Sequence, residues 1–222
     1  MISIIETYGS MLLTAMGHTL LLTLLSLLFA MVIGLIIALM NVGKNRVLNL
    51  IGTVYVDAVR GVPLIVLAYF IYFGVPAGIQ ALGFADFRLT ALKAGTIALA
   101  MNCGAYMAEI IRAGIESVDK GQMEASRSLG LSYGKSMRRV VLPQAIRTMI
   151  PSIINQFIIT LKDTSILSVI GFPELTNTGK TIMGNTFKNL QTWAIVGLMY
   201  MVVIVTLSKI AKRLERRLNR GR

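Results

Sequence analysis

The chain has 222 residues, of which 55% are hydrophobic and 14% are charged, and its formal net charge at pH 7 is +12. The mean hydropathy of +0.71 excludes an ordinary water-soluble globular domain and indicates an integral membrane protein. One cysteine and one histidine exclude an intramolecular disulfide and a multi-cysteine or histidine-rich metal site, and leave no credible Ser-His-Asp or Cys-His catalytic group.

A membrane-spanning helix needs about 20 predominantly apolar residues. The sequence has five suitable stretches, so we expect an all-α integral membrane protein with one transmembrane domain over residues 1–222. The spans are expected at about residues 11–43, 53–80, 92–115, 145–168 and 189–210. The first stretch is longer than one straight span needs, and its start is therefore expected along or above the outer interface.

Basic residues predict the orientation. Most lysines and arginines fall after the first span, between the third and fourth spans, or in the tail after the fifth. With five spans, all three segments lie on one side of the membrane. Because cytosolic segments are enriched in Lys and Arg, we expect the N-terminus outside and the C-terminus in the cytosol. The residues concerned are Lys44, Arg46, Arg112, Lys120, Arg127, Lys135, Arg138, Arg139, Arg147, Lys209, Lys212, Arg213, Arg216, Arg217, Arg220 and Arg222.

The segment between the third and fourth spans, residues 116–143, is expected to be a cytosolic coupling loop. Gln122 to Leu129 favours a helix, and Gly130 suits the left-handed conformation that often ends one. A second helix is expected from Ser132 to Val141, before Pro143 interrupts the backbone.

The spacing within this loop is specific. Glu124-Ala125-Ser126 is followed after three residues by Gly130, and after nine more intervening residues by Val140-Val141-Leu142-Pro143. This pattern resembles the EAA motif of ABC importer permeases, with Ser126 in place of Ala and Val140 in place of Ile. The resemblance implies docking on a separate ATPase subunit, and the alternative is a plain loop between two spans. It assigns ATPase coupling to Gln122, Met123, Glu124, Ala125, Ser126, Leu129 and Gly130.

Other segments resemble permeases of polar-amino-acid importers, of the histidine, glutamine and arginine type. They are Arg60–Pro63, Ala105–Ile115, Gly121–Ala125 and Leu161–Ser165. The resemblance implies two permeases and two ABC ATPase subunits, fed by an extracytoplasmic amino-acid-binding protein, in a bacterial-type cytoplasmic (inner) membrane. A permease homodimer is favoured, and a heterodimer is the alternative. The chain itself is then not an enzyme and binds no cofactor, because ATP and Mg act on the ATPase.

Gly179-Lys180-Thr181 resembles the end of a phosphate-binding loop. That loop requires a glycine where Glu174 stands, and it should follow a strand. We therefore expect these residues to form an outer loop that binds no nucleotide. The basic tail is expected to contact the lipid bilayer, and no nucleic acid is expected as a partner.

Charged residues inside spans are costly and are candidates for solute binding. Asn102, Tyr106 and Glu109 share one helix face by their i, i+4, i+7 spacing. Glu109 or Asp163 could hold an amino or guanidinium group, and Lys162 or a helix N-terminus could hold a carboxylate. The full candidate set is Glu109, Asn102, Lys162, Asp163, Asp57 and Arg60.

Two structural alternatives stay open at these positions. Glu109 can simply pair with Arg112 three residues later, and Asp57 and Arg60 can form an i, i+3 ion pair near the inner gate.

Acidic candidates outnumber basic ones, which favours basic or polar L-amino acids as the solute. Two other functions remain possible from the sequence. An ion-coupled secondary carrier or oligomeric channel would work without an ATPase, and a membrane scaffold would carry no solute. The charges at Glu109 and Lys162-Asp163 argue against a scaffold, which gains little from charge in the membrane.

Overall fold

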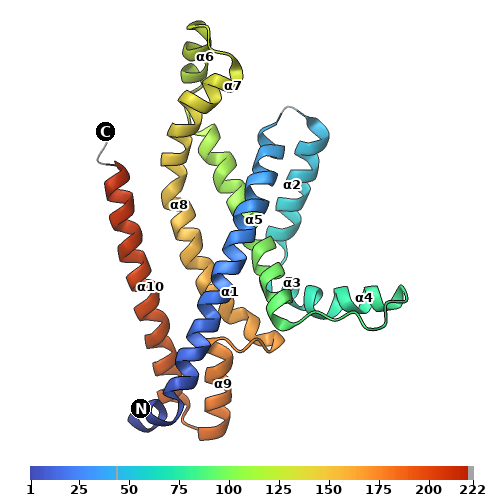
Figure 1. Cartoon of the computed structure of the whole chain (residues 1–222), viewed down its shortest axis with the longest axis vertical. Helices are drawn as coiled ribbons and strands as arrows, with labels where there is room; N and C mark the ends of the chain where they lie inside the picture. The colour runs from blue at the N-terminus through green and yellow to red at the C-terminus, as the bar shows by residue number, and fades with distance from the viewer. Residues whose placement is uncertain (44, 220–222) are drawn as a thin grey trace.

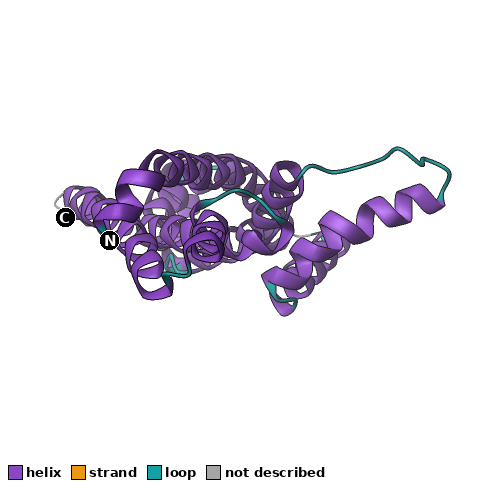
Figure 2. Cartoon of the chain, turned by 90° about the horizontal axis from the view of Figure 1, so that it is seen from below, coloured by secondary structure: helices purple, strands orange, loops and turns teal. Residues whose placement is uncertain are grey.

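The computed structural model describes residues 1–43 and 45–219, with side chains in the last helix as far as Arg213. Within that part of the chain the secondary structure is entirely helical (Figures 1 and 2). The helices are α1 (Ile2–Val42), α2 (Arg46–Gly61), α3 (Leu64–Tyr69), α4 (Val75–Ala81), α5 (Ala91–Glu116), α6 (Lys120–Ser128), α7 (Tyr133–Ser136), α8 (Leu142–Asp163), α9 (Leu175–Thr186) and α10 (Asn189–Asn219). Short π-helical stretches join α3 to α4 and α7 to α8, and a 3₁₀ helix, Thr164–Ile170, follows α8.

The predicted all-α membrane class with five spans is confirmed. Five helical stretches in the described residues are long and apolar enough to cross a membrane. They are Ile2–Val42, Leu64–Ala81, Ala91–Glu116, Tyr133–Ile170 and Asn189–Arg213.

Helix α5 is the centre of the bundle, and α1, α2 and α8 pack against it. Small residues set the distance between α1 and α5. A Cβ atom placed on Gly34 would lie 2.5 Å from the Cβ of Met107 and 3.1 Å from the Gly104 carbonyl oxygen. Such close backbone approach is typical of membrane helices that associate through small residues.

The second apolar stretch differs from the expected continuous helix over residues 53–80. Helix α2 ends at Gly61, and the chain is extended at Val62 and Pro63. Proline lacks the N–H that would continue the helix and disfavours helical geometry in the residue before it. After this break the stretch from α3 to α4 turns away from the bundle and projects sideways (Figures 1 and 2).

Pro143 does not interrupt the chain as expected. It lies in the first turn of α8, directly after the π-helical stretch Met137–Val141. A proline is tolerated in a first turn, where its missing N–H is not needed. The helix therefore runs through this position.

The segment that contains Gly179-Lys180-Thr181 is also different from expectation, since it forms α9 rather than a loop. The side chain of Glu174 caps this helix by accepting hydrogen bonds from the N–H groups of Thr176 (2.8 Å) and Asn177 (2.5 Å). Side-chain acceptance of these first N–H groups is a strong helix start signal.

At the α9 end of the molecule, three helices share an apolar cluster. Residues of α1 such as Leu12 pack with Leu175 and Ile182 of α9 and with Ile195 of α10. Two polar contacts join α1 to the start of α9 and the residue before its cap: His18 Nδ1 donates to the Pro173 carbonyl (3.0 Å), and Leu175 N–H donates to Thr19 Oγ1 (3.1 Å).

The two ends of the bundle differ in charge. Helix α6 lies at one end, together with the start of α2 and the described end of α10, whereas α9 and the N-terminus lie at the other (Figure 1). The basic segments named above therefore gather at the α6 end. Lys44, Arg220 and Arg222 belong to that prediction but lie outside the described residues, as do the side chains of Arg216 and Arg217.

Candidate functional site

The coupling segment folds as two helices joined by a glycine turn. Asp119 caps α6 by accepting the Gly121 N–H at 2.7 Å, and Gly130 follows the helix with φ = +84°. A left-handed residue at this place is costly for any residue with a Cβ, which explains the glycine. The expected short helix and its terminating glycine are both present.

Both polar and apolar residues of the motif are exposed on the surface. Gln122, Glu124 and Ala125 are exposed, and Leu129 is 85% exposed. Ser126, the residue that departs from the motif, is 5% exposed and donates to the Met123 carbonyl at 2.9 Å. The departure therefore lies inside the loop, and the surface available to another protein is unaffected by it.

Helix α6 is linked to a membrane helix. Gln144 of α8 donates through Nε2 to Gln122 Oε1 (3.4 Å) and to the Val140 carbonyl (3.0 Å). Further along, Met149 of α8 packs against Gly114 of α5, where an added Cβ would lie 3.0 Å from the methionine side chain. A displacement of α6 can thus be transmitted to α8 through the glutamine hydrogen bond, and from α8 to α5 through the contact between Met149 and Gly114.

A polar pocket of about 370 Å³ lies between α1, α2 and α5. Its α2 wall is the exposed row Thr53, Asp57 and Arg60, which follow one another at helical spacing. The full lining is Asn41, Asn49, Thr53, Val56, Asp57, Arg60, Glu109, Arg112 and Glu116.

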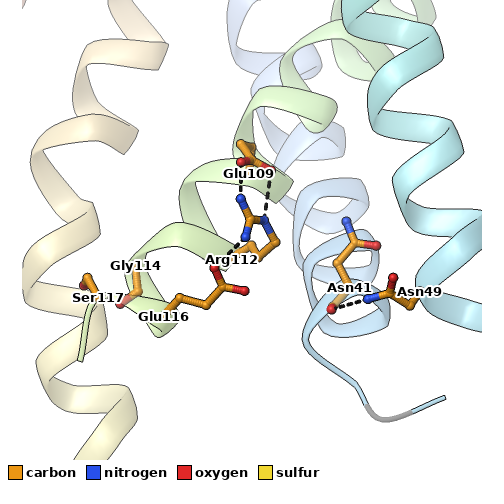
Figure 3. Close-up of polar contacts among 7 residues, drawn as sticks. All are labelled: Asn41, Asn49, Glu109, Arg112, Gly114, Glu116 and Ser117. Carbon is orange, nitrogen blue, oxygen red and sulfur yellow. Dashed lines mark hydrogen bonds and ion pairs between the residues drawn. The ribbon is translucent and has the colours of Figure 1, made fainter. Parts of the chain in front are cut away.

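Arg112 holds both carboxylates of α5 in this pocket (Figure 3). Its Nε donates to Glu109 Oε2 at 3.1 Å, its Nη2 pairs with Glu109 Oε1, and its Nη1 donates to Glu116 Oε2 at 2.5 Å. The side chains of Glu109 and Arg112 are each 32% exposed. The pairing that the sequence left open as a structural alternative for Glu109 is therefore formed.

Asn49 Nδ2 also donates to the Asn41 carbonyl at 2.6 Å, which joins α2 to α1 beside the Arg112 ion pairs (Figure 3).

Asp57 and Arg60 behave differently from that alternative. No ion pair joins them in the described part of the chain, so the suggested structural pair is not formed. The Arg60 guanidinium instead lies over the Tyr106 ring, 5.0 Å from its centroid, an arrangement that favours a cation. Both charged side chains are exposed, line the pocket, and form no ion pair with any residue that the structure describes.

The remaining candidates lie at another level of the bundle. Asn102 stands seven residues before Glu109 on α5, which is about 10 Å along a helix. At this level Thr160 Oγ1 lies 3.2 Å from Cys103 Sγ, which places the α8 residues near Lys162 and Asp163 beside Asn102 rather than Glu109. The six candidates therefore fall into two groups and do not form one pocket.

The sequence did not identify Asn41, Asn49, Thr53 and Glu116 as pocket residues. A usable signal exists for two of them, because Thr53 precedes Asp57 by one helical turn and Glu116 follows Arg112 by one turn. Asn41 and Asn49 come from different helices, and only the fold brings them together.

Comparison with protein families gives a match over residues 30–220 to the family described as "Binding-protein-dependent transport system inner membrane component". The glutamine transport system permease protein GlnP of Escherichia coli K12 is 38% identical over 200 residues, covering 90% of this chain and 89% of that protein. The arginine transport system permease protein ArtQ of Bacillus subtilis is 35% identical, covering 93% and 91%.

Solved structures give the same relationship. A crystal structure of an amino acid ABC transporter with histidines matches with a TM-score of 0.88 and 38% identity, covering 96% of each chain. The MetNI methionine ABC transporter in an inward-facing conformation matches with a TM-score of 0.80 at 21% identity, which supports the fold alone.

Proposed function

Because this chain belongs to the family of binding-protein-dependent transport system inner membrane components, we propose that it forms the solute pathway of an ATP-driven amino-acid importer. Its similarity to glutamine and arginine permeases over about nine-tenths of its length supports this function. One structural observation carries the proposal: an exposed short helix, α6, ends at left-handed Gly130 with the spacing of the family's ATPase-docking motif.

The energy source in this proposal is a separate ABC ATPase that binds ATP and Mg. Its dimer closes on ATP and moves the α6 helices of two permeases, preferably two copies of this chain. The contact between Gln122 and Gln144 then passes the displacement to α8. The permeases tilt between inward-facing and outward-facing states, so the coupling is a rigid-body movement of packed helices.

The orientation follows from charge. The α6 end carries the basic segments, and basic segments favour the cytosolic face. The α6 end thus faces the ATPase in the cytosol, while α9 and the N-terminus face an extracytoplasmic binding protein. The membrane is then the cytoplasmic (inner) membrane of a bacterium.

The pocket suggests how a solute is held on its way to the cytosol. Glu109 is already paired with Arg112, whereas Asp57 forms no ion pair among the described residues. We therefore assign Asp57 to the ammonium or guanidinium group of a basic or polar L-amino acid, and Arg60 to its carboxylate. Asn102 and Asp163 form an earlier contact, about two helical turns away, and Lys162 lies at the same level on the exposed side of α8.

The rival is an ion-coupled secondary carrier or oligomeric channel, which would need no ATPase. The two functions are distinguished in proteoliposomes that contain the chain with and without its ATPase and binding protein. The proposal expects uphill uptake of a radiolabelled amino acid only with both partners and internal ATP. Uphill uptake by the chain alone, driven by a proton or sodium gradient, would refute it.

A further inference from the structure

Helix α8 has three distinct faces. One face is buried against the bundle and includes Ala145, Met149 and Thr160. A second face is a half-buried row of isoleucines, Ile150, Ile154 and Ile158. The third face is exposed and largely polar: Thr148, Ser152, Asn155 and Lys162 recur at i, i+4, i+7 and i+14, which places them on one side of a helix. We call these four residues the α8 polar stripe.

The polar groups at the centre of the stripe are not satisfied within the chain. Thr148 Oγ1 donates to the Gln144 carbonyl at 3.2 Å. Ser152 and Asn155, by contrast, make no side-chain hydrogen bond to any residue that the structure describes. Pro151 lies beside Ser152 and has no N–H to give to the Arg147 carbonyl, so a backbone acceptor is also freed here.

Lipid cannot satisfy these groups. Asn155 lies in the central part of Tyr133–Ile170, one of the five candidate spans. In the hydrocarbon of a bilayer an unpaired amide is strongly disfavoured, and irregular or polar groups are tolerated where they face protein or a water-filled cavity. The exposed apolar side chains of α10, such as Val202 at 62% exposure, show what a lipid-facing surface of this molecule looks like.

We propose that the α8 polar stripe lines the water-filled solute path, with Asn155 and Ser152 contacting the amino acid as it passes. This inference rests on the proposed transport function. It adds two residues to that function which neither line the pocket between α1, α2 and α5 nor carry a charge.

The chemistry of the stripe indicates what it recognises. Asn155 offers both a donor and an acceptor, and Ser152 a hydroxyl, so neither selects for charge. Lys162, the charged member of the stripe, stands seven residues from Asn155, about 10 Å along the helix. The stripe therefore offers successive contacts for uncharged polar groups, such as a side-chain amide, rather than one fixed site.

The test uses water access to introduced cysteines in the assembled transporter, in native membrane vesicles. Cys103, which is the one cysteine of the chain and is 1% exposed, is first replaced by alanine. Ser152→Cys and Asn155→Cys are then made in this parent. Ile154→Cys serves as a control of matched depth on the same helix, and Val202→Cys as an exposed control on α10.

A charged methanethiosulfonate reagent reacts with thiolates that water can reach. Ser152→Cys and Asn155→Cys should react at least about tenfold faster than both controls, because thiolate formation needs a hydrated environment. Excess amino-acid substrate should slow the reaction at position 155 and leave the controls unchanged.

Two results would overturn the proposal. Position 155 could be as unreactive as position 202, which would place the stripe in lipid. Alternatively, an added mild oxidant could join Asn155→Cys to a second permease copy by a disulfide, while the reduced thiol resists the reagent, which would make the stripe a dry subunit contact. ATP-dependent uptake by the Cys103→Ala parent is measured separately, so a failure of the transport function is distinguished from a failure of this assignment.

Discussion

Gly34 of α1 lies directly against Met107 of α5, so close that a Cβ at position 34 would stand 2.5 Å from the methionine Cβ and 3.2 Å from the Ala108 backbone nitrogen. Neither neighbour can move away cheaply, because both are fixed by the central helix. The contact determines how closely the longest helix approaches the centre of the bundle.

Gly34→Ala should therefore destabilise the protein by about 1–3 kcal/mol, the usual cost of inserting a methyl group into a packed interior. Thermal unfolding of the purified protein in detergent measures the effect. Gly17→Ala in the same helix is the control, since a Cβ there meets nothing within 4 Å. Equal unfolding temperatures for the two variants would contradict the close packing.

Thr19→Val should also destabilise the α9 end of the molecule. Thr19 Oγ1 accepts the N–H of Leu175, and both residues are fully buried. Valine keeps the shape but leaves that N–H without an acceptor, at a cost of about 1–3 kcal/mol. Thr23→Val provides the comparison, because the Thr23 hydroxyl, also buried, donates to the Thr19 carbonyl of its own helix at 2.7 Å. The prediction fails if Thr23→Val is the more damaging change.

Glu174 should make stability depend on pH. It lies between the fourth and fifth spans and is 0% exposed. Burial raises the pKa of its carboxyl above the ordinary value, although hydrogen bonds from the Thr176 and Asn177 N–H groups and the Tyr200 hydroxyl oppose the rise. The folded protein therefore binds this proton more tightly than the unfolded chain does.

The sign of the effect follows from that difference. Below the ordinary glutamic acid pKa of about 4.3, both states are protonated and the stabilisation is complete. As pH rises from there through the raised pKa, the unfolded chain ionises first and the free energy of unfolding falls. Unfolding temperatures measured across this range should fall less in Glu174→Gln than in the wild type. Parallel curves for the two proteins would show that another group is responsible.

Gly130 should tolerate asparagine better than valine. A Cβ at this position meets nothing within 4 Å, so the only obstacle to a side chain is the φ of +84°. Asparagine adopts left-handed geometry far more readily than a β-branched residue. Co-purification of the ATPase and substrate-stimulated ATP hydrolysis should survive in Gly130→Asn and be lost in Gly130→Val. Loss of both in Gly130→Asn as well would mean that the glycine is needed for close approach by the partner.

Asp57→Asn should weaken the transport of cationic amino acids more than Glu109→Gln does. Arg112 already pairs with Glu109, whereas Asp57 lines the pocket and forms no ion pair in the described part of the chain. We expect the KM for arginine to rise about tenfold in Asp57→Asn, equivalent to about 1.4 kcal/mol of binding free energy. Uptake of labelled arginine in proteoliposomes gives the comparison, with Glu116→Gln as a further control. A larger effect at Glu109 would restore it as the direct ligand.

Patterns local in sequence predicted much of this molecule. Apolar stretch length gave the five spans, and the spacing from Glu124 to Gly130 gave the short helix and its left-handed end. Both depend on neighbours in the chain, so a single sequence is sufficient. The break at Val62 and Pro63 was available from the same kind of signal, but hydropathy across the whole stretch concealed it.

Features that depend on contacts between helices were not predictable in this way. Glu174 looked like a residue that merely broke a nucleotide-binding pattern, and the hydrogen bond that its carboxylate accepts from the Tyr200 hydroxyl depends on how α9 and α10 meet. That Asp57 and Arg60 form no ion pair in the described residues could not be foreseen from their i, i+3 spacing, because Tyr106 of α5 offers Arg60 another partner. Ser152 and Asn155 could be recognised as part of an exposed polar face only after the burial of each α8 residue in the fold was known.

The 85% exposure of Leu129 has a consequence for the cell that makes this protein. In the proposed transporter, a permease copy made without its ATPase leaves this leucine, directly after helix α6, uncovered and open to recognition by quality-control proteases. We expect such orphan copies to be short-lived, so that the supply of the two subunits has to be matched during synthesis.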